Sequence, residues 1–312
     1  MASEMRIFTG NANPDLARKM AEILKTDLGE IEISRFPDGE VHVKIKENIR
    51  GKDVFVVQPI CSPPNENLME LLIIIDAARR ASADRITAVL PFYGYARQDR
   101  KDQPRVPITA KLVANLLVAA GTDRLLTMDL HAQQIQGFFD IPVDHLYASP
   151  ILARFLIEKN LKNPVVVSPD TGGVKAAQAY ANMLGCGLAI IAKERKGPRE
   201  VSVLSLVGDV KGYSAVMVDD LTTTAGTLCS AAKVLKDYGA GDIYAAVSHA
   251  TMTAEGLERL KKSPIKEMVV TDSVPLKDTM GFPVTVLSVA SLLAEAVLRI
   301  HENRSVTSLF RV

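Results

Sequence analysis

The sequence predicts an α/β protein of two domains, each with a mainly parallel β-sheet flanked by helices. The chain has 312 residues, about twice the length of an ordinary domain of roughly 150 residues. Short apolar, β-branched runs alternate with longer amphipathic segments, which is the pattern of strands joined by crossover helices. The alternation is interrupted and restarts near residue 148. We therefore expect one domain at residues 1–148 and a second at residues 149–312.

The expected strands occur in both halves, as the runs RIFTG, VFVVQP, ITAVLPF, LLTMDLH, VVVSPD, LAIIAKE, AVMVDD, IYAAVSH and MVVTD. Helices are expected at 66–81, 107–120 and 226–238, where apolar residues recur at three- and four-residue spacing. The second half begins with YASP, which predicts a helix with Ser149 as its N-cap and Pro150 at its first position.

One segment departs from this alternation. GEIEISRFPDGEVHVKIKENIRG alternates polar and apolar residues on either side of Pro37, Asp38 and Gly39. Strand-like alternation around a turn sequence predicts a hairpin. We expect a β-hairpin flap at residues 31–50.

Composition excludes several classes of protein. The formal net charge is only +1, which argues against nucleic-acid binding, because that depends on clustered cations. No apolar run approaches the roughly 20 residues that span a bilayer, and the start lacks a signal-peptide pattern. We expect no membrane partner and a cytoplasmic protein. Three widely spaced cysteines, Cys61, Cys186 and Cys229, favour reduced thiols over a disulfide framework or a zinc site.

The stretch VMVDDLTTTAGTL at 216–228 has the organisation of a phosphate-binding loop. An apolar strand ends in Asp219 and Asp220, a hydroxyl-rich loop follows, and then a helix begins. Backbone N–H groups of residues 223–227, threonine hydroxyls and the helix N-terminus can bind one phosphate together. The two carboxylates suit sugar hydroxyls or a water-bridged metal ion.

Three other segments carry polar groups at expected strand ends. VVVSPDTGGVK places Asp170 and two glycines before a helix, which allows close backbone approach to a charged ligand. PFYGYARQDRK puts phosphate-competent groups at 97–100 after an aromatic run. LLTMDLH ends near His131, which suits a metal ligand or its supporting partner.

A basic excursion, KERKGPRE at 193–200, lies between two apolar strands. It can form an arm that brings Lys193 and Arg195 to a phosphoryl group. Each of these patterns also has a structural alternative that stays open here: a strand end, a tight turn, a solvated charged face, a structural histidine or a basic surface hairpin.

Taken in this order, the motifs resemble those of the ribose-phosphate pyrophosphokinases. The resemblance covers essentially the whole chain, through GNANPDLA, RFPDGEV, NENLMELLIIIDAARRASA, LPFYGYARQDR, PITAKLVANLL, MDLHAQQIQGFFDIPVD, SPDTGG, the KER arm, VDDLTTTAGT and SVTSLF. The VDD…AGT loop is shared by phosphoribosyltransferases of this fold. YGYARQDR together with DLHAQQIQGFF is far more specific.

The resemblance implies two tandem phosphoribosyltransferase-type, Rossmann-like domains, with the flap in the first and roughly the last 12 residues packing back on it. It implies transfer of the β,γ-diphosphoryl group of MgATP to ribose 5-phosphate, giving phosphoribosyl pyrophosphate and AMP for nucleotide, histidine and tryptophan biosynthesis. It also implies Mg²⁺ as cofactor, a homo-oligomer (a hexamer formed as a trimer of dimers), and ADP and inorganic phosphate as allosteric ligands.

Carried over by position, the resemblance assigns ATP to Phe36, Asp38, Glu40, Arg97, Gln98 and Asp99. Ribose 5-phosphate is assigned to Asp219, Asp220, Thr223, Thr224, Ala225, Gly226 and Thr227. A diphosphate loop is assigned to Asp170, Thr171, Gly172 and Gly173. Mg²⁺ is placed at His131 and Asp170, and the catalytic cations are Lys193 and Arg195. The regulatory candidates, which are weaker, are Arg50, Arg100, Lys101, Arg105, Ser305, Ser308 and Phe310.

The chain departs from the family pattern at Thr223, where many relatives have an aspartate. This difference leaves open a catalytically silent regulatory homologue. The stretch 100–106 also has fewer cations than some relatives carry, which weakens the regulatory expectation. A phosphoribosyltransferase or a DNA-binding regulator of the same fold is a further alternative. The near-zero net charge disfavours the DNA-binding regulator, and the adenine-site motifs disfavour the transferase.

Overall fold

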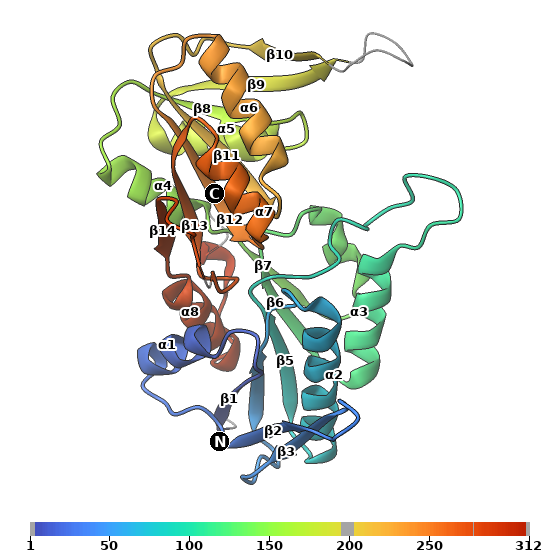
Figure 1. Cartoon of the computed structure of the whole chain (residues 1–312). Coiled ribbons are helices and arrows are strands. Elements are labelled where there is room, and N and C mark those ends of the chain that lie inside the picture. Colours follow the sequence, from blue (N-terminus) through green and yellow to red (C-terminus); the bar gives the residue numbers. More distant parts are fainter. Residues whose placement is uncertain (1–3, 195–202, 277, 310–312) are drawn as a thin grey trace. The chain divides into compact units, whose positions relative to one another are not determined.

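The computed structural model describes residues 4–194, 203–276 and 278–309, and its contacts divide the chain into two compact units (Figure 1). Within the described residues, the first unit contains 4–147, 273–275 and 288–309. The second contains 148–194, 203–272, 276 and 278–287. The chain passes into the second unit after Tyr147 and later returns to the first.

The first unit is an α/β body with a five-stranded parallel sheet. Its elements are β1 (Met5–Thr9), α1 (Pro14–Leu24), β2 (Ile31–Arg35), β3 (Val41–Ile45), β4 (Asp53–Val57), α2 (Pro64–Arg80), β5 (Arg85–Leu90), α3 (Thr109–Ala120), β6 (Arg124–Met128), η1 (Gln133–Phe138), β7 (Val143–Leu146), α8 (Ala290–His301) and η2 (Thr307–Leu309). The strand order is β1-β4-β5-β6-β7, and every neighbouring pair is parallel.

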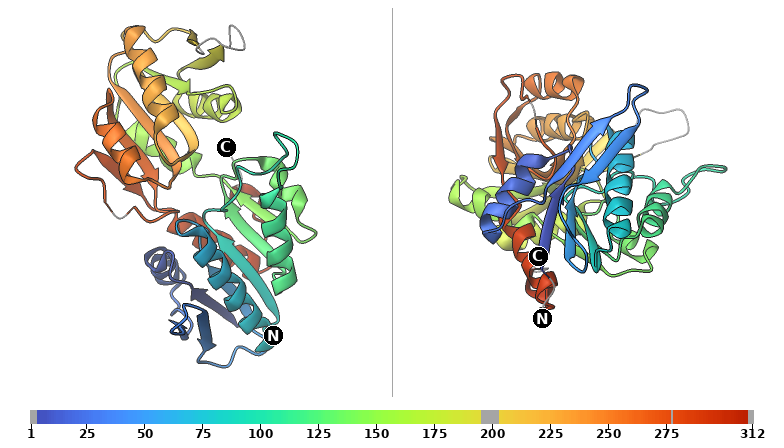
Figure 2. Two further views of the ribbon diagram at one scale, coloured as in Figure 1. Left: turned by 45° about the vertical axis from the view of Figure 1, so that its right-hand side comes forward. Right: turned by 90° about the horizontal axis from the view of Figure 1, so that it is seen from below.

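Helices cover both faces of this sheet. Figures 1 and 2 show α2 and α3 on one face and α1 with α8 on the other. The expected flap is present as the antiparallel pair β2 and β3, which packs beside α2. Its apolar side chains, Ile31, Ile33, Val43 and Ile45, are partly buried against the core under α2 and α3. Burial of one side of the hairpin fixes which residues face outward at its tip.

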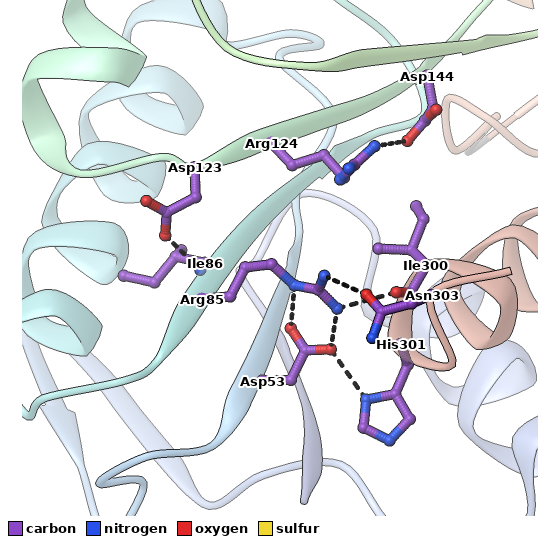
Figure 3. Close-up of polar contacts among 9 residues, drawn as sticks. All are labelled: Asp53, Arg85, Ile86, Asp123, Arg124, Asp144, Ile300, His301 and Asn303. Atoms are coloured by element: carbon purple, nitrogen blue, oxygen red, sulfur yellow. Dashed lines mark hydrogen bonds and ion pairs between the residues drawn. The ribbon is translucent and has the colours of Figure 1, made fainter. Parts of the chain in front are cut away.

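The last turn of α8 is bound to the amino-terminal edge of the first sheet (Figure 3). Asp53, the first residue of β4, is only 1% exposed and pairs with Arg85, the first residue of the neighbouring strand β5. Arg85 Nε donates to Asp53 Oδ1 at 2.9 Å, and Arg85 Nη2 donates to Asp53 Oδ2 at 2.5 Å. Arg85 also donates to the carbonyl of Ile300, and His301 Nδ1 lies 2.9 Å from Asp53 Oδ2. A cation at a helix C-terminus satisfies carbonyls that the helix leaves free. The terminal stretch is therefore an integral part of the first unit.

The second unit has a seven-stranded sheet. Its elements are α4 (Ser149–Glu158), β8 (Pro164–Ser168), α5 (Val174–Leu184), β9 (Gly187–Glu194), β10 (Val203–Val207), β11 (Ser214–Thr222), α6 (Gly226–Asp237), β12 (Ile243–Ala250), α7 (Ala254–Lys261), β13 (Ile265–Thr271) and β14 (Val284–Leu287). The order is β10-β9-β8-β11-β12-β13-β14, and only β10 is antiparallel to its neighbour.

The predicted α/β class and the mainly parallel sheets are confirmed. The helices expected at 66–81, 107–120 and 226–238 are α2, α3 and α6, within two residues at each end. The expected N-cap at Ser149 is wrong: Ala148 is the cap residue, and Ser149 is the first residue of α4. The Ser149 hydroxyl is buried without a hydrogen-bond partner, so it caps no backbone N–H group.

All three cysteines are free of disulfide bonds. Burial raises the pKa of the Cys186 and Cys229 thiols, which keeps them protonated and poorly nucleophilic. None of the helices in the described part of the chain is long and apolar enough to cross a membrane.

Candidate active site

The second sheet reverses its strand order between β8 and β11. The chain moves from β8 to β9 on one side and then resumes with β11 on the other side of β8. In open parallel sheets, ligands bind at the carboxyl ends of the strands where the order reverses. Asp170 lies in the loop that leaves β8, and Asp219 lies near the carboxyl end of β11, so the topology places these two candidates on adjacent strands at the expected ligand-binding edge.

The loop after β11 leads directly into α6. Ala225, the residue before the helix, has a left-handed backbone with φ of 53° and supplies no side-chain cap. The first N–H groups of α6 therefore donate no hydrogen bond to a capping side chain, and such groups bind anions readily. Arg259 on α7 donates to the carbonyl of Thr224 at 3.1 Å, which holds the loop from behind. The loop is thus a braced turn that presents a helix N-terminus.

Thr223 has a defined partner just after the neighbouring strand β12. Its hydroxyl oxygen lies 2.8 Å from that of Thr251, after β12. The backbone of the same loop is fixed by the N–H of Thr253, which donates to the Thr223 carbonyl at 3.1 Å. Gly256 approaches this carbonyl closely, since an added Cβ there would lie 2.7 Å from its oxygen. Thr251, Arg259 and Gly256 support the loop, but no motif in the sequence identified them.

The strand was expected to end at Asp219 and Asp220, but both residues lie within β11, which continues to Thr222 before this loop begins. The N–H of Asp220 donates to Asp219 Oδ1 at 2.9 Å. Burial, the neighbouring carboxyl of Asp220 and, more weakly, Asp170 raise the pKa of Asp219 to about 8. Three carboxyl groups therefore lie close enough to repel one another. A cation or a hydroxyl-rich ligand would relieve this repulsion.

Asp170 orders the loop after β8. Its Oδ1 accepts hydrogen bonds from the N–H groups of Gly172 and Gly173 at 2.8 and 3.0 Å. The Ser168 hydroxyl donates to the Asp170 carbonyl at 2.6 Å. Asp170 and Thr171 are exposed at this edge, so the second carboxyl oxygen of Asp170 remains available for a ligand.

In the first unit, the loops after β5 and β6 are joined at the carboxyl edge of the sheet. Gln134 Nε2, after β6, donates to Asp99 Oδ2, after β5, at 2.7 Å. Within the segment after β5, the hydroxyl of Thr109, the first residue of α3, donates to Gln98 Oε1 at 2.5 Å. Arg97 and His131 are exposed on these same loops. The fold therefore brings the candidates from 97–99 and 131 to one edge. The other metal candidate, Asp170, belongs to the second unit.

Phe36, Asp38 and Glu40 lie at the exposed tip of the flap. Lys193 is in β9, and Arg195 and Phe310 fall outside the described residues. The remaining regulatory candidates are exposed: Arg50, Arg100, Lys101, Arg105, Ser305 and Ser308. Arg299 on α8 donates to the Ser305 carbonyl at 3.1 Å and to the Ser308 hydroxyl.

Two family models match the chain. Residues 5–121 match the N-terminal domain of ribose phosphate pyrophosphokinase, and residues 197–311 match the phosphoribosyl synthetase-associated domain. The ribose-phosphate pyrophosphokinase of Caldanaerobacter subterraneus subsp. tengcongensis is 54% identical over 310 residues, covering 99% of this chain and 98% of that protein. This chain belongs to the ribose-phosphate pyrophosphokinase family.

Other relatives agree with this assignment. The ribose-phosphate pyrophosphokinase of Gloeobacter violaceus is 53% identical over 309 residues, covering 98% of this chain and 93% of that protein. The crystal structure of phosphoribosylpyrophosphate synthetase from Mycobacterium smegmatis has a TM-score of 0.91 and 42% identity, covering 96% of this chain and all of that one. The chain is thus an enzyme of nucleotide biosynthesis, a diphosphokinase with two tandem phosphoribosyltransferase-type domains, as predicted.

Proposed function

We propose that the chain joins ribose 5-phosphate and ATP by diphosphoryl transfer at the edges described above. The anomeric oxygen of ribose 5-phosphate attacks the β-phosphorus of ATP, the bond from that phosphorus to the α,β-bridging oxygen breaks, and AMP leaves with the bridging oxygen. The hydroxyl proton is lost, and phosphoribosyl pyrophosphate forms. Family membership with nearly complete coverage carries this proposal.

The loop at 223–227 is proposed to bind the 5-phosphate. Its support is the uncapped N-terminus of α6 and the bracing of Thr224 by Arg259. Asp219 and Asp220 are placed beside it, where carboxyl groups accept hydrogen bonds from ribose hydroxyls. The raised pKa of Asp219 supports a ligand at this point, because hydrogen-bond donors or a cation offset the crowded negative charge.

Asp170, Thr171, Gly172 and Gly173 are proposed to bind the transferred diphosphate. The loop is ordered by Asp170 and leads into α5, whose cap residue, Gly173, offers no side-chain hydrogen bond. A diphosphate there would lie on the strand adjacent to the one that carries the ribose site. The adjacency of these strands supports a site where the transferred group and the ribose would bind close together.

Mg²⁺ is the proposed cofactor, held by His131 and Asp170. Carboxylate oxygens suit this hard cation, and the described residues contain no preformed cluster of three protein ligands. Mg²⁺ usually keeps several waters and binds through one or two protein groups and substrate phosphates. His131 and Asp170 would hold the ion, which would supply neutralisation of the phosphate charge.

ATP is proposed to bind the flap tip through Phe36, Asp38 and Glu40 and the loop after β5 through Arg97, Gln98 and Asp99. The exposed aromatic ring of Phe36, 49% accessible, is free to stack on a base. Lys193 and Arg195 are proposed to contact the transferred group, where a cation stabilises the charge that develops in the transition state.

We also propose a cytoplasmic homo-oligomer, a hexamer as a trimer of dimers, with ADP and inorganic phosphate as allosteric ligands at Arg50, Arg100, Lys101, Arg105, Ser305, Ser308 and Phe310. Two exposed apolar residues on α3, Leu112 and Leu116, supply surface for subunit contact.

The ribose site is tested by binding ribose 5-phosphate to the purified protein, followed by calorimetry, with Asp220→Asn as the variant. We expect weaker binding because ribose hydroxyls lose an acceptor. Asp237→Asn on the far end of α6 is the matched control and should bind like the wild type. Equal affinity of Asp220→Asn and the wild type would contradict the assignment.

A further inference from the structure

The tip of the flap is closed by contacts of its own. Phe36 N–H donates to the Glu40 carbonyl at 2.9 Å, and Gly39 N–H donates to the Phe36 carbonyl at 2.9 Å. The Phe36 ring stands edge-on to His42 with centroids 5.3 Å apart. These contacts hold the tip in one shape, but none of them ties it to the rest of the first unit.

Arg35, the last residue of β2, connects the flap tip to the rest of the first unit. Its Nη1 donates to the carbonyl of Gly39 in the turn at 2.9 Å and lies 2.7 Å from Glu66 Oε2. Glu66 is in the first turn of α2. One guanidinium group therefore connects the flap tip to the start of this helix.

The residue before Glu66 holds the second segment assigned to ATP. The Tyr95 hydroxyl donates to Asn65 Oδ1. Tyr95 has a left-handed backbone, with φ of 63°, and its carbonyl accepts from Gln98 N–H at 2.9 Å. This turn presents Arg97 and Gln98, and a non-glycine residue in the left-handed region needs support from its surroundings.

The first turn of α2 is itself firmly held. Asn67 Nδ2 donates to the Cys61 carbonyl at 2.9 Å. Glu70, 3% exposed, accepts from Gln58 Nε2 at 2.8 Å and from the backbone and side chain of Asn11 at 2.6 and 2.8 Å. A buried carboxylate with three donors is a rigid support, because moving it would weaken several hydrogen bonds at once in a site that water does not reach.

We propose that Asn65 and Glu66 form a shared anchor that positions both ATP-binding segments, with Arg35 as the positioning residue of the flap and Tyr95 as that of the loop after β5. This inference rests on the proposed assignment of ATP to residues 36–40 and 97–99. None of the four anchor residues needs to touch the nucleotide. By holding the flap tip and the loop after β5 in place, they reduce the conformational entropy that these two segments would otherwise lose when ATP binds.

Charge reversal with rescue tests the flap anchor. In Glu66→Arg, the guanidinium of Arg35 faces a second positive charge. In Arg35→Glu, the carboxylate of Glu66 faces a second negative charge. We expect each single variant to raise the Kd and KM for ATP by roughly 2- to 5-fold, the effect of losing an exposed ion pair. In the double variant Arg35→Glu/Glu66→Arg the attraction returns, so most of the loss should be recovered.

The controls separate positioning from folding. The KM for ribose 5-phosphate and the thermal midpoint should stay close to wild type, since both side chains are about half exposed. Arg80→Glu and Asp76→Arg, singly and together, reverse an exposed pair on the last turns of α2 and should leave ATP affinity unchanged. Tyr95→Phe, which keeps the ring and removes the donor to Asn65, should weaken ATP binding in the same way.

Three outcomes would overturn the anchor: unchanged ATP affinity in the single variants, no recovery in the double variant, or an equal effect from the Arg80 pair. The calorimetric Kd for ATP is independent of turnover. A wild-type protein that binds ATP without forming phosphoribosyl pyrophosphate would contradict the proposed reaction and still allow the anchor to be tested.

Discussion

Asp219→Asn should stabilise the ligand-free protein at alkaline pH. The pKa of Asp219 is raised from its ordinary value of 3.8 to about 8, first by burial and then by Asp220. Between these values the native state keeps a proton that the unfolded state has lost. The free energy of unfolding therefore falls as pH rises through this window.

The size of the effect follows from the shift. The slope of a single such group is about 1.4 kcal/mol per pH unit, so the ionised carboxyl costs on the order of 5 kcal/mol above pH 8 at most. Asparagine carries no charge at any pH and lacks this dependence. The advantage of the variant should be close to zero near pH 4, grow through pH 5 to 8 and level off above.

Urea unfolding at pH 5, 7 and 9, without Mg²⁺ or phosphates, measures this difference. Asp242→Asn is the control, because Asp242 is exposed in the same unit and its pKa is lowered by Lys266. The free energy of unfolding of Asp242→Asn should not exceed that of the wild type at pH 9. The same pH slope for wild type and Asp219→Asn would refute the crowded-carboxylate account of this site.

Three other changes have defined outcomes. Gly256→Ala puts a methyl carbon 2.7 Å from the Thr223 carbonyl oxygen, and this overpacking, which costs roughly 1 to 3 kcal/mol, should raise the KM for ribose 5-phosphate. Gly137→Ala is the control, because the space around Gly137 is open. Equal KM values for the two variants would count against the prediction. Asp53→Ala leaves Arg85 without its carboxylate partner and should lower the free energy of unfolding, measured by urea titration, by roughly 3 kcal/mol. The control is Asp76→Ala, which removes one partner of an exposed ion pair and should lower that free energy by less than about 1 kcal/mol. Similar losses in the two variants would be inconsistent with a structural role for Asp53. Lys193→Ala should nearly abolish turnover in a coupled AMP assay while ATP affinity changes less, and unaltered turnover would remove Lys193 from the catalytic group.

Strand and helix placement was predictable from the sequence because local patterns decide it. Apolar runs of five or six residues became β4, β5 and β6, and the periodic segments became α2, α3 and α6. The weaker cases were β7 and β14, at four residues each too short to stand out as strands.

The return of the chain to the first unit had no comparable local signal. We expected roughly the last 12 residues to pack there, and the contacts place residues 288–309, including all of α8, with that unit. α8 packs on α1 through its buried apolar face, and its last turn is also held by Asp53 and Arg85 through contacts to His301 and Ile300. These contacts join residues more than 200 positions apart, so the spacing of residues in the sequence does not indicate them.

The candidate site was found through motifs at strand ends, but its supporting residues were not. Arg259 and Thr251 come from elements 35 and 28 residues away from the groups they contact. Their placement depends on how α7 and β12 pack against the loop. Single arginines and threonines are common on surfaces, so only the folded contact distinguishes them.

Formation of AMP and phosphoribosyl pyrophosphate by the purified chain tests the central claim most directly. The reaction mixture contains ribose 5-phosphate, ATP, Mg²⁺ and phosphate, and Lys193→Ala is the control. We predict robust formation of both products by the wild type, with Thr223 in its present place, and loss of both in the variant. ATP binding without product would contradict the account and favour a catalytically silent member of the family.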